Sequence, residues 1–86
     1  MKDEFQLMVS KKIKAVRNVM NLSQRQMAEQ LGISRDLMAK YETTICPSAE
    51  FLFSFSEIYT LSIKELLNPK TAVEDFITTI KIEFLK

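Results

Sequence analysis

Several polar side chains near the middle of the chain could recognise another molecule. Ser34, Arg35, Asp36 and Lys40 fall at the start of a short predicted helix and one turn into it. A guanidinium fork such as that of Arg35 donates two parallel hydrogen bonds, and O6 and N7 of guanine are a matching pair of acceptors. Asp36 could accept a hydrogen bond from N4 of cytosine, or it could stabilise the start of its own helix through the helix dipole. These residues indicate recognition by hydrogen bonding.

Residue types that serve catalysis are scarce. The chain has no histidine and a single cysteine, Cys46. A suitably placed carboxylate pair, a glycine-rich phosphate loop and the usual spacing of metal ligands are also missing from the sequence. We therefore expect no enzymatic activity, no metal site and no cofactor. We expect Cys46 to be a small buried apolar residue, since that is the commoner role of a lone cysteine.

The recognition residues lie in a predicted pair of short helices. In the first helix, which begins near Gln24 after the capping residue Ser23, Met27, Ala28 and Leu31 form an apolar face. Gly32, the only glycine, falls at the turn, where a left-handed backbone conformation is common. Ser34 then caps a second helix, whose buried side carries Met38 and Tyr41. This arrangement leaves Arg35, Asp36, Leu37, Ala39 and Lys40 facing outward, as in a helix-turn-helix.

The stretch Leu22 to Glu42 reads LSQRQMAEQLGISRDLMAKYE. It resembles the Cro/C1 type of phage-repressor helix-turn-helix in its Ser-Gln start, its Gly-Ile-Ser turn and its Lys-Tyr-Glu end. The resemblance extends back to Ile13 and forward through Pro47 and Ser48 to Leu66 and Leu67. It implies an all-α fold, namely a five-helix phage-repressor-like DNA-binding domain. It also implies a transcriptional regulator that binds double-stranded DNA.

The resemblance also implies roles for particular residues. Gln24 would contact a DNA phosphate, and Arg17 would form a structural ion pair with Glu42. Residues near the start of the second helix would reach base edges in the major groove. Apolar Leu37 could contact a thymine methyl or be partly buried. The predicted DNA-binding residues are Gln24, Arg25, Ser34, Arg35, Asp36, Leu37, Ala39, Lys40 and Thr43, and Lys12 could add charge.

The sequence departs from the family after Glu42. The family often continues with Asn-Gly and one or two basic residues that bind phosphate, whereas this chain has Thr43, Thr44, Ile45 and Cys46. The usual phosphate contact is thus missing, although the threonine hydroxyls and the backbone amides of this loop could replace it.

Composition and charge agree with one small domain that binds nucleic acid through its first half. The chain has 86 residues, of which 47 % are apolar and 27 % are charged, and its net charge is +1. Residues 1–42 carry +3 and residues 43–86 carry −2, so the basic excess lies with the helix-turn-helix. No apolar run is long enough to span a membrane, and no signal-peptide core is present, so we expect a cytoplasmic protein.

The remaining sequence predicts four more helices. The first covers about residues 3–20, with Phe5, Ile13 and Val16 facing inward and Lys11, Lys12 and Lys14 mostly facing solvent. Others are predicted from Ala49 to Tyr59, with Leu52, Phe55, Ser56 and Tyr59 inward, and from a capping box at Ser62 and Glu65 to Leu67. A last helix would follow a capping box at Thr71 and Glu74, although residues 79–86 also alternate like a strand.

The end of the chain is expected to mediate dimerisation. We divide the chain into a helix-turn-helix domain, residues 1–69, and a C-terminal dimerisation segment, residues 70–86. We do not expect one small domain to bury two further apolar stripes, and exposed patches of that size usually mark interfaces. The predicted interface comprises Phe51, Phe53, Ile58, Val73, Phe76, Ile77, Ile80 and Phe84. A two-fold dimer would require a palindromic operator.

Two alternatives remain open at this stage. The last helix could instead fold back over the Phe51 and Phe53 face, leaving a monomer. The domain could also be a protein-interaction module of the same fold, such as an antitoxin or antirepressor, that acts mainly through a protein partner. The low net charge and the uncharged loop after Glu42 favour this second function.

Overall fold

The computed structural model describes residues 4–84, with side chains described for residues 4–81. Six helices follow one another: α1 (Glu4–Val19), α2 (Gln24–Leu31), α3 (Arg35–Thr43), α4 (Ala49–Ile58), α5 (Ile63–Leu67) and α6 (Val73–Phe84). The predicted all-α architecture, five helices plus a C-terminal one, is therefore confirmed. Residues 79–84 are helical, so the strand alternative is wrong for them, while residues 85 and 86 lie outside the described part. No described helix has the length and apolar character needed to cross a membrane.

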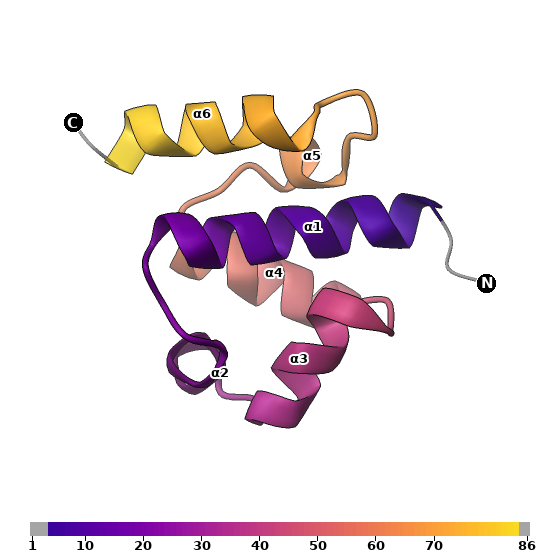
Figure 1. Cartoon of the computed structure of the whole chain (residues 1–86), viewed down its shortest axis with the longest axis vertical. Helices are drawn as coiled ribbons and strands as arrows, with labels where there is room; N and C mark the ends of the chain where they lie inside the picture. Colours follow the sequence, from indigo (N-terminus) through magenta and orange to yellow (C-terminus); the bar gives the residue numbers. More distant parts are fainter. Residues whose placement is uncertain (1–3, 85–86) are drawn as a thin grey trace.

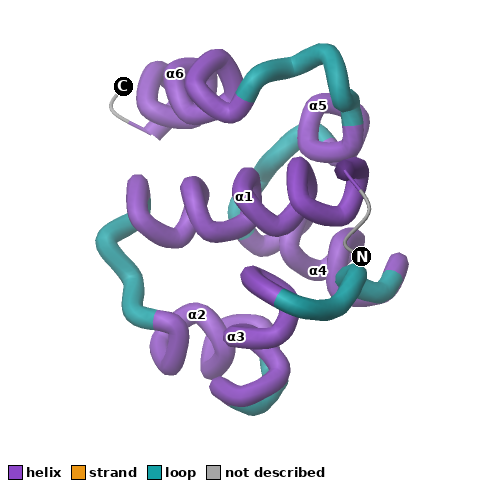
Figure 2. Tube along the Cα trace, turned by 45° about the vertical axis from the view of Figure 1, so that its right-hand side comes forward, coloured by secondary structure: helices purple, strands orange, loops and turns teal. Residues whose placement is uncertain are grey.

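α1 lies at the centre of the arrangement. Figure 1 shows α6 running beside α1 in the same direction, with α2 and α3 on the other side of α1 and α4 behind it. The turned view agrees, with α1 between α6 and the α2–α3 pair (Figure 2). The helix-turn-helix therefore projects on the side of α1 that faces away from α6.

One apolar core joins all six helices. It consists of Val9, Ile13 and Val16 from α1, Met27 and Ala28 from α2, Met38 and Tyr41 from α3, Phe51 and Phe55 from α4, Tyr59, Leu66 from α5, and Phe76 and Ile80 from α6. A row of aromatic rings runs through it, with centroids 4.5 Å apart for Tyr41 and Phe51, 5.7 Å for Phe51 and Phe55, and 5.3 Å for Phe55 and Tyr59. These separations are typical of favourable ring packing, so the row ties α3 firmly to α4.

Serine side chains fix the starts of four helices. The hydroxyls of Ser23, Ser34, Ser48 and Ser62 each accept a hydrogen bond from the backbone amide three residues later. At the α2–α3 turn, Gly32 has φ +70°, and the amide of Ile33 donates to the carbonyl of Ala28 at 3.0 Å. A residue with a Cβ is strained in this left-handed conformation, so the glycine allows the sharp turn between the two helices.

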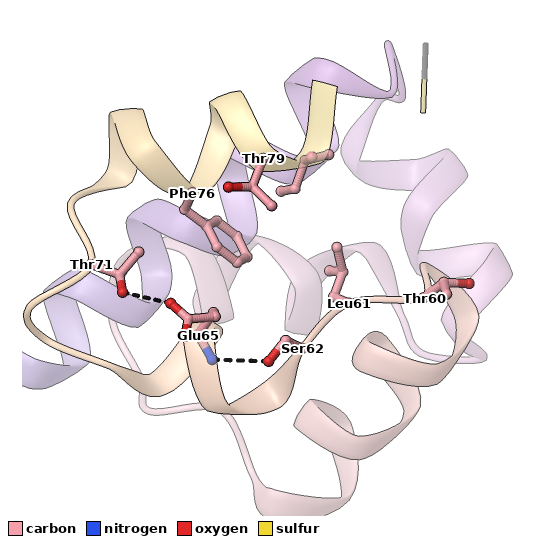
Figure 3. Close-up of a pocket in the computed structure, with 8 residues that line it drawn as sticks. Thr60, Leu61, Ser62, Glu65, Thr71, Phe76 and Thr79 are labelled. Carbon is pink, nitrogen blue, oxygen red and sulfur yellow. Dashed lines mark hydrogen bonds between the residues drawn. The ribbon is translucent and has the colours of Figure 1, made fainter. Parts of the chain in front are cut away.

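The capping predictions around α5 and α6 need correction. The hydroxyl half of the predicted box at Ser62 forms, but the Glu65 carboxylate accepts a 2.7 Å hydrogen bond from the Thr71 hydroxyl instead (Figure 3). Thr71 does not cap α6, because that helix begins at Val73, two residues later. Glu65 and Thr71 thus brace the turn between α5 and α6, at the edge of a pocket of about 260 Å³ beneath α6.

Lys12 was expected to face solvent and is fully buried. Its ammonium group donates hydrogen bonds to the carbonyls of Glu65 at 2.8 Å and Asn68 at 2.9 Å, and it lies 5.3 Å from the centre of the Phe76 ring. Burial lowers the pKa of Lys12, and the nearby Glu65 carboxylate opposes that shift. These carbonyls also accept backbone hydrogen bonds, from the amides of Asn68 at 3.3 Å and Thr71 at 3.2 Å, so the lysine from α1 adds a second, charged donor to each and ties the end of α5 to α1. Lys12 is therefore not available for DNA.

Three residues of the predicted dimer interface are covered by their own chain. Phe51, Phe76 and Ile80 are only 6 %, 4 % and 3 % exposed, so the expectation that a single chain would leave them open is wrong. The reason is that α6 folds back along α1 and that α4 turns Phe51, rather than the predicted Leu52, fully into the aromatic row. Phe53 and Ile58 stay 62 % and 47 % exposed, Val73 and Ile77 are half-buried, and the side chain of Phe84 lies outside the described part.

Two smaller expectations also differ from the structure. Phe5 is 42 % exposed, so the buried stripe of α1 begins later, at Val9. Cys46 is exposed in the loop between α3 and α4 rather than buried. Pro47 beside it is buried, which leaves the cysteine on the outer side of the loop.

Candidate nucleic-acid interface

The predicted recognition residues form one outward face of α3. Arg35 and Asp36 are exposed in its first turn, and Lys40 and Thr43 are exposed further along. Arg35, Ala39 and Thr43 follow one another at four-residue steps, as do Asp36 and Lys40, so the two rows lie side by side on the helix. The side chain of Ser34 is engaged at the cap, where its hydroxyl accepts a 3.1 Å hydrogen bond from the amide of Leu37.

Leu37 and Ala39 are less available than the other members of this face. Both are half-buried, and Leu37 packs against the core beside Leu31, Ile33 and Tyr41. The structure therefore shows the partial burial that was one of the two alternatives for Leu37.

A buried ion pair holds α3 against α1, as predicted. Arg17 Nε donates to Glu42 Oε2 at 2.7 Å and its Nη2 donates to Oε1 at 3.1 Å, a bidentate arrangement. The side chain of Glu42 is 1 % exposed and that of Arg17 is 13 % exposed. Arg17 Nη1 also donates to the Leu22 carbonyl at 2.9 Å, so the same guanidinium ties the corner before α2. The prediction of an at least partly buried pair is confirmed.

Gln24 belongs to this network, a role that sequence reasoning missed. Its Nε2 donates to Glu42 Oε1 at 3.2 Å, which links the first residue of α2 to the end of α3. A side-chain amide has a second N–H, so this bond leaves one donor for a phosphate. The Ser23 hydroxyl takes the amide of Gln26, which leaves the amides of Gln24 and Arg25 at the start of α2, where the helix dipole favours an anion.

Three basic residues of this surface are unpaired. Arg25, Arg35 and Lys40 are exposed, and within residues 4–81 no carboxylate lies within 4.0 Å of any of their charged nitrogens. Their charges are thus not neutralised by the protein itself. They lie on α2 and α3, where phosphate groups of a duplex against the recognition face would pass.

The loop after α3 has fewer free hydrogen-bond donors for a phosphate than we expected. The amides of Thr44 and Ile45 both donate to the Lys40 carbonyl, at 2.8 and 3.0 Å, and the Thr43 hydroxyl donates to the Ala39 carbonyl at 2.7 Å. These groups therefore complete the end of the helix rather than pointing outward as free donors. The suggestion that amides of this loop replace the missing basic residues is wrong for Thr44 and Ile45.

Two long-range hydrogen bonds also position the helix pair. The Ser10 hydroxyl donates to the Tyr41 carbonyl at 2.9 Å, between α1 and α3. The Tyr59 hydroxyl donates to Gln30 Oε1 at 2.6 Å, between the end of α4 and α2, and burial raises the pKa of Tyr59. No local sequence pattern marks either bond, since the partners are 31 and 29 residues apart.

Comparison with known proteins identifies related sequences. A family model described as helix-turn-helix matches residues 13–66. Antitoxin PezA from Streptococcus pneumoniae serotype 4 (strain ATCC BAA-334 / TIGR4) is 35 % identical, in a match that covers 92 % of this chain and 52 % of the relative. The chain thus spans about half the length of this curated relative. No solved structure matches the chain.

Proposed function

We propose that this chain, which belongs to the Cro/C1-type helix-turn-helix family, binds a specific operator through α3 in the major groove. A DNA-binding helix-turn-helix regulator is the role that family membership supports. The observation that carries the finer proposal is Arg35, which is exposed and unpaired in the first turn of a helix whose far end is fixed by the Arg17–Glu42 pair. A rigid helix is needed because base contacts depend on accurate placement.

In the proposed complex the two helices have different tasks. Arg35 donates to a guanine, with Asp36 and Lys40 reaching neighbouring base edges or phosphates. Gln24 and Arg25 at the start of α2 contact the phosphate backbone, which sets the position of the protein on the duplex. A bound repressor of this kind would act by occupying the operator. We expect the protein in the cytoplasm, where it would meet that DNA.

Arg35→Ala is expected to relax sequence preference. Losing a bidentate contact to guanine should reduce discrimination at one base pair by about 1–3 kcal/mol. The measurement is binding to a duplex selected from a random pool, and to its single-base variants. Arg25→Ala is the matched control: it removes one charge near phosphate, so it should weaken all these duplexes alike and reduce the salt dependence. Unchanged preference in Arg35→Ala would place the recognition helix elsewhere.

We further propose a two-fold homodimer, with Ile58 at its centre. The sequence predicts Phe53 and Ile58 in one patch. They are five positions apart, which places them about 140° from each other around α4, so they lie on different faces of the helix. Ile58 is 47 % exposed at the end of the helix, and Leu61, three residues later, is half-buried. Two recognition helices in such a dimer would meet half-sites of a palindromic operator about 34 Å apart. Among residues 70–81 we assign the half-buried Val73 to this dimer, because Ile77 lines a groove between α1 and α6.

Ile58→Ser should weaken this dimer strongly. Fully burying an isoleucine is worth about 1.5–3 kcal/mol, and Ile58 has about half of its surface left to bury. Removing it from both subunits should therefore cost about 1.5–3 kcal/mol in total and raise the dissociation constant about 10- to 100-fold. Sedimentation over a range of concentrations measures the change. Ile45→Ser, at a similarly exposed isoleucine in the loop after α3, is the control and should leave the dimer intact. If the two variants behave alike, Ile58 is not in the interface.

A second candidate function is that of an antitoxin acting mainly through a protein partner. The 35 % identical relative named Antitoxin PezA favours it, as does the lack of free basic donors in the loop after α3. Binding to random duplex DNA at several salt concentrations separates the two candidates. The affinity of a DNA-binding protein for the duplex falls steeply with salt, because binding releases counterions from the DNA. A module that binds only protein does not bind the duplex at any of these salt concentrations.

A further inference from the structure

A basic groove lies between α1 and α6, away from the recognition face. Lys11, Lys14 and Asn18 from α1 and Lys81 from α6 line it, together with Ala15, Val19 and Ile77. The groove has a volume of about 510 Å³. All three lysines are exposed, and within residues 4–81 none has a carboxylate within 4.0 Å of its ammonium group. We call these seven residues the basic groove.

The composition of the basic groove indicates which kind of segment could bind there. Three unneutralised ammonium groups attract negative charge, and a partly apolar floor gains from contact with an apolar side chain. A phosphate backbone would satisfy the lysines but leave Val19 and Ile77 in water. A segment with an apolar side chain between carboxylates would satisfy both.

The chain itself carries such a segment on α4. Glu50, Phe53 and Glu57 follow the spacing of one helix face, and all three are exposed. Phe53 is 62 % exposed, more than any other large apolar side chain in the described part, and neither glutamate is in an ion pair there. We call this face the acidic ridge. Because α4 contains no lysine or arginine, two acidic ridges packed against each other would bring four carboxylates together, which is unfavourable.

We propose that the acidic ridge of one copy docks into the basic groove of a second copy. Phe53 then covers Val19 and Ile77, and Glu50 and Glu57 approach the lysines of the two walls. Glu50 and Glu57 are seven positions apart, which is about 10.5 Å along the helix, and packed helices such as α1 and α6 lie about 8–10 Å apart. A ridge that crosses the groove therefore places one carboxylate near the lysines of α1 and the other near Lys81 of α6.

This contact is head-to-tail. The groove residues of α1 lie opposite its core residues Val9, Ile13 and Val16, and Phe53 lies opposite the core face of α4. Both surfaces thus point away from the shared core in different directions, so one copy offers its groove to one neighbour and its ridge to another. Such a contact does not close, and it becomes strong when copies sit side by side on DNA, where their effective concentration is high. It uses neither Ile58 nor Arg35, so it goes beyond the proposed function.

Charge reversal tests the contact. The groove variant Lys14→Glu/Lys81→Glu and the ridge variant Glu50→Lys/Glu57→Lys change exposed residues only, and melting curves check that both fold. Sedimentation at low salt should show association beyond the dimer for the parent chain, weakened at least about tenfold in either variant alone because like charges then meet. Mixing the two variants should restore it, since each ridge then finds a groove of opposite charge. Raising the salt from about 0.1 M to about 1 M, which shortens the Debye length from about 10 Å to about 3 Å, should weaken it in the parent.

The outcomes are distinguishable from those of the proposed function. If the groove variant associates like the parent, or if the mixture stays dissociated, the ridge–groove contact is wrong. If the groove variant instead loses affinity for a duplex with a single operator and the mixture does not recover association, the groove binds DNA phosphates. Binding of the ridge variant to that single operator reports on the DNA-binding proposal alone, because Glu50 and Glu57 lie on α4, outside the recognition face.

Discussion

Replacing Glu42 by alanine should lower the free energy of unfolding by about 3–5 kcal/mol, because the Arg17 guanidinium would stay largely buried without its partner. The side chain of Glu42 is 1 % exposed and accepts three hydrogen bonds, two from Arg17 and one from Gln24. For a domain of this size each kcal/mol shifts the melting temperature by about 4–8 °C, so a drop of about 12 °C or more is expected. Thermal and urea unfolding measure it.

Two further variants separate the contribution of the Glu42 charge to stability from the contribution of its packing. Glu42→Gln keeps the shape and a hydrogen-bond acceptor, so it should destabilise the chain less than alanine does. The double variant Arg17→Met/Glu42→Leu removes both charges and should recover part of the loss, since an apolar replacement of a buried pair is often tolerated. A melting curve of Glu42→Ala that overlays the parent would mean that the pair contributes nothing to stability. We also expect Glu42→Ala to lower DNA affinity, because α3 loses its fixed orientation, although the buried Glu42 side chain would not contact DNA itself.

Lys12→Met should be the second strongly destabilising substitution. The methionine fills a similar volume but loses two hydrogen bonds from a charged donor, each worth about 1.5–3 kcal/mol, and leaves the carbonyls of Glu65 and Asn68 with only their longer backbone bonds. Loss of the ammonium group above the Phe76 ring adds to the effect. Denaturant unfolding gives the total, and hydrogen exchange should show the largest loss of protection in α5 and α6.

The neighbouring lysines supply the control. Lys11→Met and Lys14→Met remove the same charge from exposed positions one and two residues away, so each should stay within about 0.5 kcal/mol of the parent. Equal effects at all three positions would show that charge alone matters and that the two carbonyl bonds of Lys12 are unimportant.

The local elements were determined by the sequence itself. Ser23, Ser34 and Ser48 each precede a helix that starts where predicted, because a hydroxyl at that place satisfies an amide of the first turn. Gly32 marks the turn because its φ of +70° suits a residue without a Cβ. The motif also predicted the Arg17–Glu42 pair and the outward face with Arg35. These features depend on residues close in sequence or on a pattern shared by the family.

Tertiary packing decided what the local pattern left open. Lys11, Lys12 and Lys14 look alike in the sequence, yet only Lys12 donates to the carbonyls at the end of α5, more than fifty residues away. Phe51 and Phe53 are both aromatic residues of α4, and only Phe51 meets Tyr41. The hydrogen bond from Gln24 to Glu42 and the packing of α6 against α1 form only in the folded chain. Periodicity tells which side chains share a face of one helix, but which neighbour covers that face depends on how all the helices fill one common core.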